Sequence, residues 1–243
     1  MAWLVYRRDA MHSRRRQRTR RRTAACLCLV NLMARAAHAQ SPCDGPALIG
    51  EVFTGSAWSV PLPLAVDAVG QHSRMRARYS TRPFADAPYY SYRVARTARD
   101  GAAIEAEMLH HKLYLENPSP PIDHLEVTHG YNLPTINATG PGHGWQWRVG
   151  MGVVVAHPEG RVAGNDLSGA RTALGGGYHI AGITTQFAVG RRYQLGRGTT
   201  HAFAAPEVKV TASWARISVD SVVLRIPNIA FHALGGLGFR HCQ

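Results

Sequence analysis

Apolar and polar residues alternate one by one along most of the chain from Ser73 onward, and no long stretch follows the 3.6-residue period of an amphipathic helix. Between residues 145 and 155 all the odd-numbered positions are apolar, while the even positions are mostly glycine or polar. Such alternation is typical of strands with two unlike faces. Segments of this kind predict eight strands, at residues 74–79, 90–95, 104–108, 125–132, 145–155, 181–189, 207–214 and 228–239. The chain is therefore predicted to be all-β.

The segments between these strands fall into two groups. Asp100-Gly101 favours a tight hairpin turn, and the glycines at 196 and 198 favour another. The joins at 82–88, 116–121 and 158–175 are longer. Short joins at one end and longer joins at the other predict an antiparallel up-and-down arrangement. Residues 134–144 are the exception, because they read as a long join at the end where the pattern requires a short turn.

The N-terminal segment has the three parts of a secretory signal. An arginine-rich stretch is followed by a short apolar one at 23–33 and by Ala37-His38-Ala39 before Gln40. We therefore predict that residues 1–39 are a signal peptide, removed on export. The formal net charge is +13, but this leader holds ten arginines and one acid, so only +4 remains outside it. A nucleic-acid partner is not expected, because its basic footprint would lie within the fold.

Residues 40–70 carry weaker alternation. Pro61 and Pro63 argue against a central strand there, so we predict a lead-in segment at 40–70 and a barrel domain at 71–243. Loss of the leader leaves Cys43 and Cys242, which form a disulfide if the two ends of the chain meet, and otherwise remain as two free thiols.

The two faces of the strands decide the environment of the predicted barrel. The polar face carries both signs of charge in near balance, as expected of ion pairs packed inside a narrow barrel. The apolar face is aromatic toward the strand ends, where two membrane interfaces select such rings. We therefore predict an eight-stranded antiparallel up-and-down transmembrane β-barrel with a closed polar interior. Its predicted interior ion-pair network comprises Arg74, Arg76, Arg78, Arg93, Glu105, Glu107, Glu126, Arg148, Glu207 and Lys209.

The last predicted strand, in residues 228–240, has alternating apolar residues and an aromatic near the C-terminus. Together with the export signal, the even strand count and the turn pattern, it resembles the small outer-membrane β-barrel proteins of Gram-negative bacteria. The resemblance implies that Phe231, Leu237 and Phe239 are an assembly signal read by the barrel-assembly machinery. It also implies contact with outer-membrane lipids and lipopolysaccharide. Four residues follow Phe239, where the family usually ends on the aromatic residue.

The sequence leaves two other functions open. His124, Glu126, Thr128 and His129 offer a base, an acid and a hydroxyl, which can support acyl transfer. The resemblance implies that such an enzyme would modify lipid A at the barrel rim. The greater expectation is that such groups only hydrogen-bond one another. The other alternative is a soluble periplasmic carrier similar to a lipocalin, which requires apolar side chains to converge on a central cavity. No metal site and no cofactor are expected, because the adjacent His110 and His111 point to opposite faces of a strand.

Overall fold

The computed structural model describes residues 46–68, 70–99, 101–140, 145–167, 174, 176–195 and 201–242. Every regular element within these ranges is a β-strand. No helix in them is long and apolar enough to cross a membrane. The predicted signal peptide at 1–39 lies outside the described residues.

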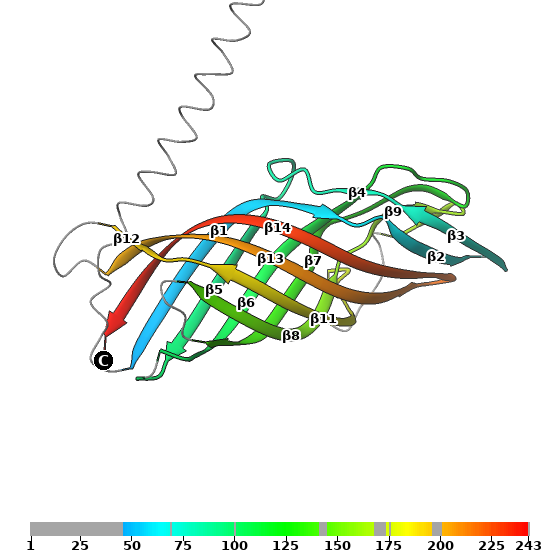
Figure 1. Ribbon diagram of the computed structural model, residues 1–243. Coiled ribbons are helices and arrows are strands. Elements are labelled where there is room, and N and C mark those ends of the chain that lie inside the picture. Colours follow the sequence, from blue (N-terminus) through cyan, green and yellow to red (C-terminus); the bar gives the residue numbers. More distant parts are fainter. Residues whose placement is uncertain are drawn as a thin grey trace, which may run out of the picture. The chain divides into compact units, whose positions relative to one another are not determined.

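Eight antiparallel strands form a closed ring (Figure 1). Each strand pairs with its neighbours in the order β7, β8, β11, β13, β14, β1, β5 and β6, and β6 pairs with β7 to close the ring. The fold class predicted from the sequence is thereby confirmed. The strands are β1 (Ala47–Ser59), β5 (Tyr90–Thr97), β6 (Ala103–Leu115), β7 (Ile122–Gly140), β8 (Gln146–Ala156), β11 (His179–Gly190), β13 (Ala202–Val219) and β14 (Val222–Cys242).

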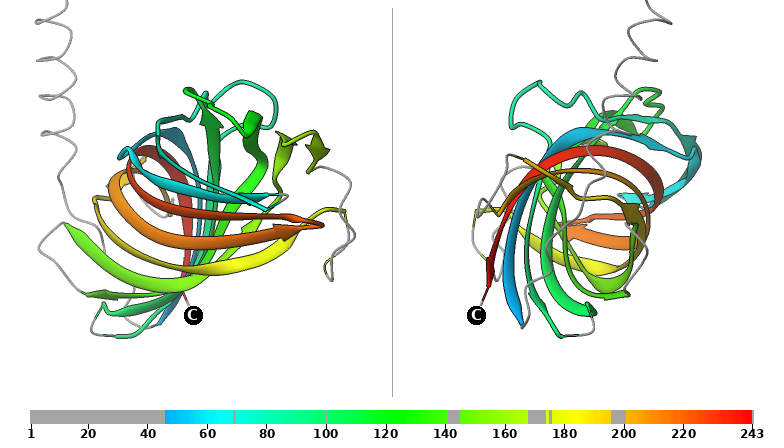
Figure 2. Two further views of the ribbon diagram at one scale, coloured as in Figure 1. Left: turned by 90° about the vertical axis from the view of Figure 1, so that its right-hand side faces the viewer. Right: turned by 60° about the vertical axis from the view of Figure 1, so that its left-hand side comes forward.

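Shorter strands extend one end of this ring. We call the end where Ala47 lies opposite Cys242 the proximal end, and the other the distal end. At the distal end, β2 (Leu62–Ala68) pairs with β3 (Gln71–Ala77) and with the start of β14, while β9 (Glu159–Val162) joins β7 to β10 (Asn165–Asp166). Figure 2 shows these additions beside the tilted strands of the ring. β4 (Tyr79–Ser80) pairs with β6, and β12 (Tyr193–Gln194) pairs with β13.

The predicted lead-in at 40–70 is wrong for residues 47–59, which form β1 in the middle of the sheet. The alternation of β1 is hidden because its inward face mixes Ile49 and Phe53 with Glu51. Pro61 and Pro63 lie beyond β1, and β14 pairs with β2 only from Ala65 onward. The predicted first strand at 74–79 is likewise wrong as a ring strand, because β3 pairs only with β2 among the described strands. The count of eight holds because β1 replaces it.

The long join expected at 134–144 is also corrected. β7 continues through Gly140, so strand rather than loop occupies most of this segment. Pro134 is accommodated opposite Met108 of β6, and the ladder with β8 skips from Asn132 to Thr135. A proline has no N–H to donate, so an interruption of one ladder at this position is expected.

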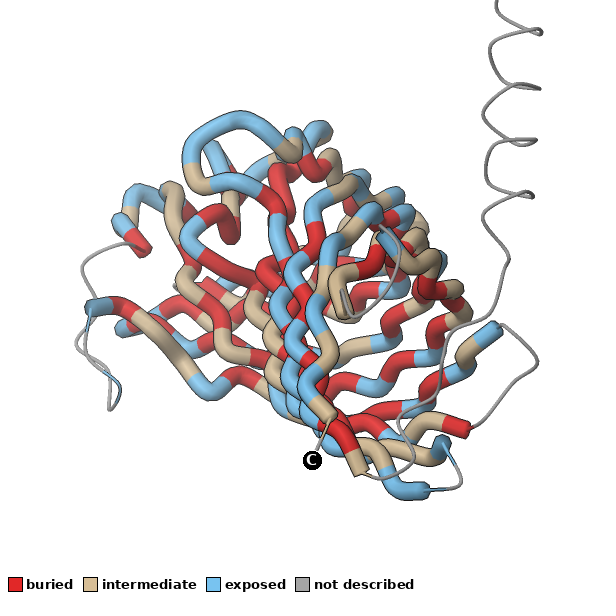
Figure 3. Tube along the Cα trace, turned by 90° about the vertical axis from the view of Figure 1, so that its left-hand side faces the viewer, coloured by how far each residue is buried: buried red, intermediate tan, exposed pale blue. Residues whose placement is uncertain are grey.

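Inward and outward positions of the ring differ sharply in burial, and buried and exposed residues alternate along the strands in Figure 3. The outward side chains of Tyr92, Val153 and Phe231 are 47%, 39% and 48% exposed. The apolar faces of the ring strands therefore point away from the interior, as the sequence predicted.

The proximal end brings the chain termini of the ring together. Cys242 is disulfide-bonded, while Cys43 lies outside the described residues. Ala47, four residues after Cys43, is paired with Cys242 across β1 and β14. Four residues extend at most about 14 Å, which is enough to bring two Cα atoms within the roughly 4.4–6.8 Å that a disulfide requires.

We expect Cys43 and Cys242 to be bonded to each other. Digestion of the purified protein without reductant should yield one cross-linked peptide that contains both residues, and reduction should split it. Recovery of Cys242 cross-linked to a second copy of the chain, or to another cysteine, would contradict this pairing.

Candidate functional site

A buried ion-pair network fills the interior of the proximal half of the ring. Arg93 of β5 lies at its centre, where its guanidinium contacts Glu51 at 3.0 Å and Glu207 at 2.9 Å, with Glu107 at 3.3 Å and Glu105 at 3.5 Å. None of these five side chains is more than 2% exposed. Four carboxylates around one guanidinium need further cations, because an unpaired buried charge costs several kcal/mol.

Three further cations complete the balance. Arg148 of β8 contacts Glu105 at 2.9 Å and also pairs with Glu207. Arg192 contacts Glu51 at 2.8 Å, and Lys209 of β13 pairs with Glu107. The network thus contains four carboxylates and four cations. Asn137 and Gln186 add hydrogen bonds to Glu107 at 3.1 Å and 2.8 Å.

The contacts of this network cross the interior of the ring. Lys209 is on β13 and Glu107 is on β6, which are four strands apart in either direction around the ring. Arg93 reaches from β5 to Glu207 on β13, past β1 and β14. Strands that share no backbone hydrogen bonds are therefore tied together by side chains through the centre.

Six of the ten residues predicted for this network lie in it, namely Arg93, Glu105, Glu107, Arg148, Glu207 and Lys209. The other four do not. Arg74, Arg76 and Arg78 are exposed, because β3 lies in the distal hairpin and not in the ring. Glu126 is half-buried in the distal part of β7, where it pairs with His124.

Two members of the network were not predicted from the sequence. Glu51 belongs to β1, which the sequence did not predict as a strand, and Arg192 follows β11, beyond the strand predicted at residues 181–189. A count of charge could not have revealed them, because the six correctly predicted residues already balance at three acids and three cations, and Glu51 and Arg192 add one charge of each sign.

The substitution Arg93→Met should destabilise the folded barrel by about 3–5 kcal/mol, because it leaves four buried carboxylates against three cations. Urea unfolding of the detergent-solubilised protein, followed by the shift between folded and unfolded bands on a gel, measures this change. The control is Arg74→Met, a change of the same residue type on exposed β3, which should stay within about 0.5 kcal/mol of the unmodified protein. Equal effects of the two substitutions would show that the network does not hold the ring.

Above the charges, toward the distal end, lies a layer of aromatic and imidazole rings. His232 hydrogen-bonds with the hydroxyl of Tyr89 at 2.5 Å and with that of Thr211 at 2.8 Å. The ring of His111 lies 5.1 Å from that of His232 and 6.1 Å from that of Tyr131. All these residues are buried. The layer separates the charged interior from the part of the lumen that follows.

The distal part of the interior is apolar, which corrects the expectation of a polar interior throughout. Its side chains come from the ring and from the β2–β3 hairpin, and they form one buried cluster. The ones at most 1% exposed at this end include Leu64, Val66, Leu109, Leu113, Leu125, Val127, Leu133, Val154, Ile217, Leu224 and Ile226. These aliphatic side chains fill the distal end of the barrel, on the far side of the charged layer.

Lys112 of β6 anchors a distal loop. Its ammonium donates hydrogen bonds to the carbonyl oxygens of Arg82 at 3.2 Å and Ala87 at 2.7 Å, and also to that of Ala85. The hydroxyl of Tyr114 donates to Asp86 in the same loop, at 2.7 Å. Lys112 itself is fully buried. The loop at 81–89 is therefore held by side-chain contacts, with Lys112 making three of them, rather than by strand pairing.

The substitution Lys112→Met should release this loop while leaving the ring folded. Hydrogen bonds to a charged group contribute about 1.5–3 kcal/mol each, so chymotrypsin should cut at the exposed Phe84 about tenfold faster or more. Arg99→Met, at the exposed proximal turn, is the matched control and should not change the rate. A cleavage rate at Phe84 that is the same in Lys112→Met as in the unmodified protein would contradict the anchoring role.

The predicted catalytic residues lie on the distal part of β7. His124 pairs with Glu126, and His129 pairs with Glu159 of β9. The hydroxyl of Thr128 donates to the other oxygen of Glu159 at 3.2 Å, and His157 lies 3.6 Å from Glu159. Burial lowers the pKa of His157, so its ring is neutral at pH 7.

This arrangement does not form a relay for acyl transfer. A hydroxyl nucleophile needs a base that accepts its proton, and the hydroxyl of Thr128 donates to a carboxylate rather than to either predicted histidine. Both of those histidines are more than half exposed and use their ring nitrogens on carboxylates. The four residues are therefore hydrogen-bonded among themselves and to Glu159.

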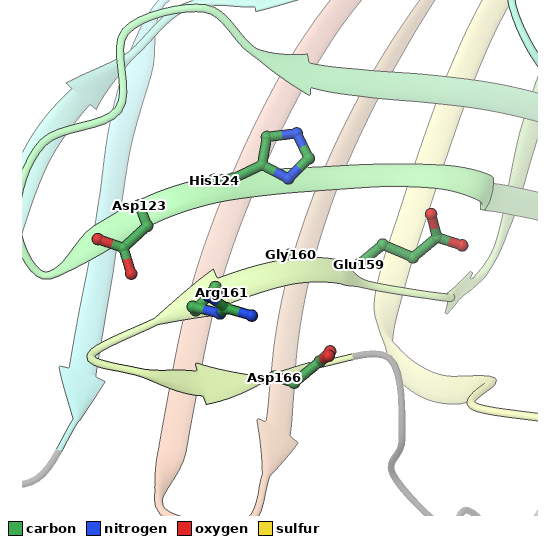
Figure 4. Close-up of a pocket in the computed structure, with 6 residues that line it drawn as sticks. All are labelled: Asp123, His124, Glu159, Gly160, Arg161 and Asp166. Carbon is green, nitrogen blue, oxygen red and sulfur yellow. The ribbon is translucent and has the colours of Figure 1, made fainter.

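A shallow depression of about 420 Å³ lies next to these residues. It is lined by Asp123, His124, Glu159, Gly160, Arg161 and Asp166, which Figure 4 draws on β7, β9 and β10. Among the described residues, no group of three or more histidine, cysteine or acidic side chains is placed to hold a metal ion. The depression is thus a polar surface feature with mixed charge.

The outward face of the ring carries aromatic residues near both ends. Trp145 and Trp147 lie at the proximal end, where the guanidinium of Arg191 stacks 5.8 Å from the ring of Trp145. Toward the distal end Trp214 is 52% exposed, and the exposed Trp58 packs against Phe231 at 5.7 Å. Between them most outward residues are aliphatic or small, with Phe187 and Tyr92 also exposed on this face. By its own geometry the chain is an eight-stranded β-barrel, charged within and apolar without.

Comparison with known proteins gives matches at the level of fold only. No protein-family model matches the sequence, and no curated protein matches it. Among solved structures, outer membrane protein AlkL matches with TM-score 0.47 and 12% identity, over 84% of this chain and 94% of that chain. Ail of Yersinia pestis matches with TM-score 0.35 and 10% identity, over 82% and 99%. E. coli outer membrane protein W matches with TM-score 0.34 and 13% identity, over 81% and 98%. AlkL and protein W are named as outer membrane proteins, and Ail as the attachment invasion locus protein.

Proposed function

We propose that the chain is an integral outer-membrane β-barrel that has no open pore and acts through its outer surfaces, in a structural, adhesive or lipid-interacting role. The observation that carries this proposal is the division between faces: eight balanced charges within the ring and exposed apolar side chains outside it. In water, so large an exposed apolar surface would promote aggregation. In a bilayer it is solvated by acyl chains, and ring closure satisfies the backbone hydrogen bonds.

The height of the apolar surface supports a membrane location. On β13 the outward positions run from Ala204 to Trp214 before Arg216 interrupts them. Ten residues at about 3.4 Å each, tilted by about 40°, span about 25 Å, which is the height of the apolar band in outer-membrane barrels.

The filled interior argues against conduction and against a carrier function. Charged side chains, with Ile49, Phe53 and Phe203 beside them, occupy the proximal half of the lumen, and packed hydrocarbon occupies the distal half. A ring of eight strands leaves room for little more than its own side chains. A lipocalin-like carrier would instead need an apolar cavity within the ring and a polar outer face.

Assembly by the barrel-assembly machinery is part of this proposal. Phe231, Leu237 and Phe239 lie on the outward face of β14, the last strand, and are 48%, 58% and 55% exposed. A factor that binds the final strand from outside the barrel would find these three side chains accessible.

Met151→Arg tests the orientation in a membrane. Met151 is 69% exposed on β8, between the aromatic ends of the apolar band. A charge there should cost about 2–4 kcal/mol in lipid vesicles. Phe84→Arg makes the same kind of change in the distal loop and should have little effect. In cells the unmodified protein should fractionate with the outer membrane and migrate differently on gels before and after heating. Recovery in soluble periplasmic extracts would overturn the proposal.

A further inference from the structure

Three arginines lie in one row across the distal end of the sheet. Arg216 of β13 is paired with Arg225 of β14, Arg225 with Ala65 of β2, and Ala65 with Arg74 of β3. Residues directly opposite each other in antiparallel strands share a face, and neighbouring strands lie about 4.8 Å apart. The row therefore extends about 15 Å across four strands. Arg76 continues it along β3, and the exposed Arg78 follows just beyond the end of this strand.

This row carries more positive charge than its surroundings neutralise. Asp67 contacts Arg225 at 2.6 Å and also hydrogen-bonds with His72. Within the described part of the chain, no carboxylate forms an ion pair with Arg74 or Arg216. Arg216 and Arg225 face each other directly, and like charges in that position destabilise a sheet. The arginines of the interior, by contrast, all contact carboxylates.

The arginine row lies next to the distal edge of the outward apolar band. On β13, Arg216 is the next outward residue after Trp214. On β14, Arg225 follows Pro227, Ile229 and Phe231 along the same face. Exposed tryptophans mark the level of lipid headgroups, and two residues of a tilted strand rise only about 5 Å. The arginines therefore begin where the band of apolar side chains ends.

The opposite side of the distal end is acidic rather than basic. β7 and β14 are four strands apart in the ring, and the β7 side carries Asp123, Glu126, Glu159 and Asp166 around the surface depression. Its exposed Arg161 lines that depression among three of these acids. Among the described residues of the distal end, it is therefore the side of β13, β14, β2 and β3 where guanidinium groups without a carboxylate partner lie next to exposed tryptophans.

We propose that this arginine row binds the phosphate groups of lipopolysaccharide in the outer leaflet, with Arg216, Arg225 and Arg74 as the contact residues. The inference rests on the proposed outer-membrane location. Guanidinium groups bind phosphate oxygens in bidentate pairs. A row of them is suited to a lipid that carries more than one phosphate at the same height. The attached acyl chains would lie against the apolar residues of β13 and β14 below.

The experiment measures binding of lipopolysaccharide to the detergent-purified protein, using intact and chemically dephosphorylated lipopolysaccharide as probes. The triple variant Arg74→Gln, Arg216→Gln and Arg225→Gln should bind intact lipopolysaccharide at least about tenfold more weakly than the unmodified protein. Dephosphorylated lipopolysaccharide should bind both proteins equally weakly. The control triple variant Arg96→Gln, Arg99→Gln and Arg161→Gln changes three other exposed arginines and should bind as the unmodified protein does.

Unchanged affinity of the distal triple variant would overturn the inference, and so would equal binding of intact and dephosphorylated probes. Tighter binding of heparin than of lipopolysaccharide to the same arginines would assign the row to a soluble polyanion and overturn it as well. Heat-dependent gel migration verifies that each variant is folded. Fractionation of the unmodified protein separates the two proposals: outer-membrane recovery without a phosphate effect refutes only the arginine site, whereas soluble recovery refutes the membrane location.

Discussion

The structure depends on neutralising charge within a closed ring of strands. Closure leaves no sheet edge, but it also forces the inward residues of eight strands into a space that excludes most water. Glu51, Glu105, Glu107 and Glu207 occupy this space together with four cations, and each carboxylate contacts more than one of them or adds a neutral donor. Because Arg93 and Lys209 reach across the lumen, the same contacts that neutralise the charge also fix the cross-section of the barrel.

Polar and apolar packing divide the interior along its axis. The charged layer lies in the proximal half of the ring, and most of the hydrocarbon cluster lies toward the distal strands and the β2–β3 hairpin. The distal end therefore has an apolar core like that of a water-soluble domain. This core is continuous with the charged interior at the proximal end. This arrangement leaves the outer surfaces, rather than the lumen, as the places where another molecule can bind.

Sequence alternation predicted most of the ring because seven of its strands have clearly unlike faces. It failed at β1, where Ile49 and Phe53 share the inward face with Glu51 and no polar side emerges. It also placed Arg74, Arg76 and Arg78 in the lumen, since alternation alone does not distinguish a ring strand from a hairpin beside it. Both errors hid the arginine row and Glu51. Which strands pair with each other depends on the whole topology, so the local pattern could not correct either error.

The candidate chemistry was predicted less well than the fold. His124, Thr128 and His129 are close in sequence, yet the bulged, glycine-containing end of β7 directs Thr128 and His129 to the same carboxylate of β9. Glu159 was not among the predicted residues because it lies in a long join between ring strands. Gly130 adopts a φ of +133°, a conformation that L side chains rarely adopt, and it marks the irregularity that parity alone overlooks.

The central claim, that the apolar face contacts acyl chains, is tested most directly by tryptophan fluorescence in vesicles of brominated lipids. Trp58, Trp145, Trp147 and Trp214 all lie on the outward face at the ends of the apolar band. The account predicts strong quenching by bromines close to the headgroup and weaker quenching by bromines at the end of the acyl chain. Emission insensitive to either lipid, but quenched by acrylamide in water, would contradict it.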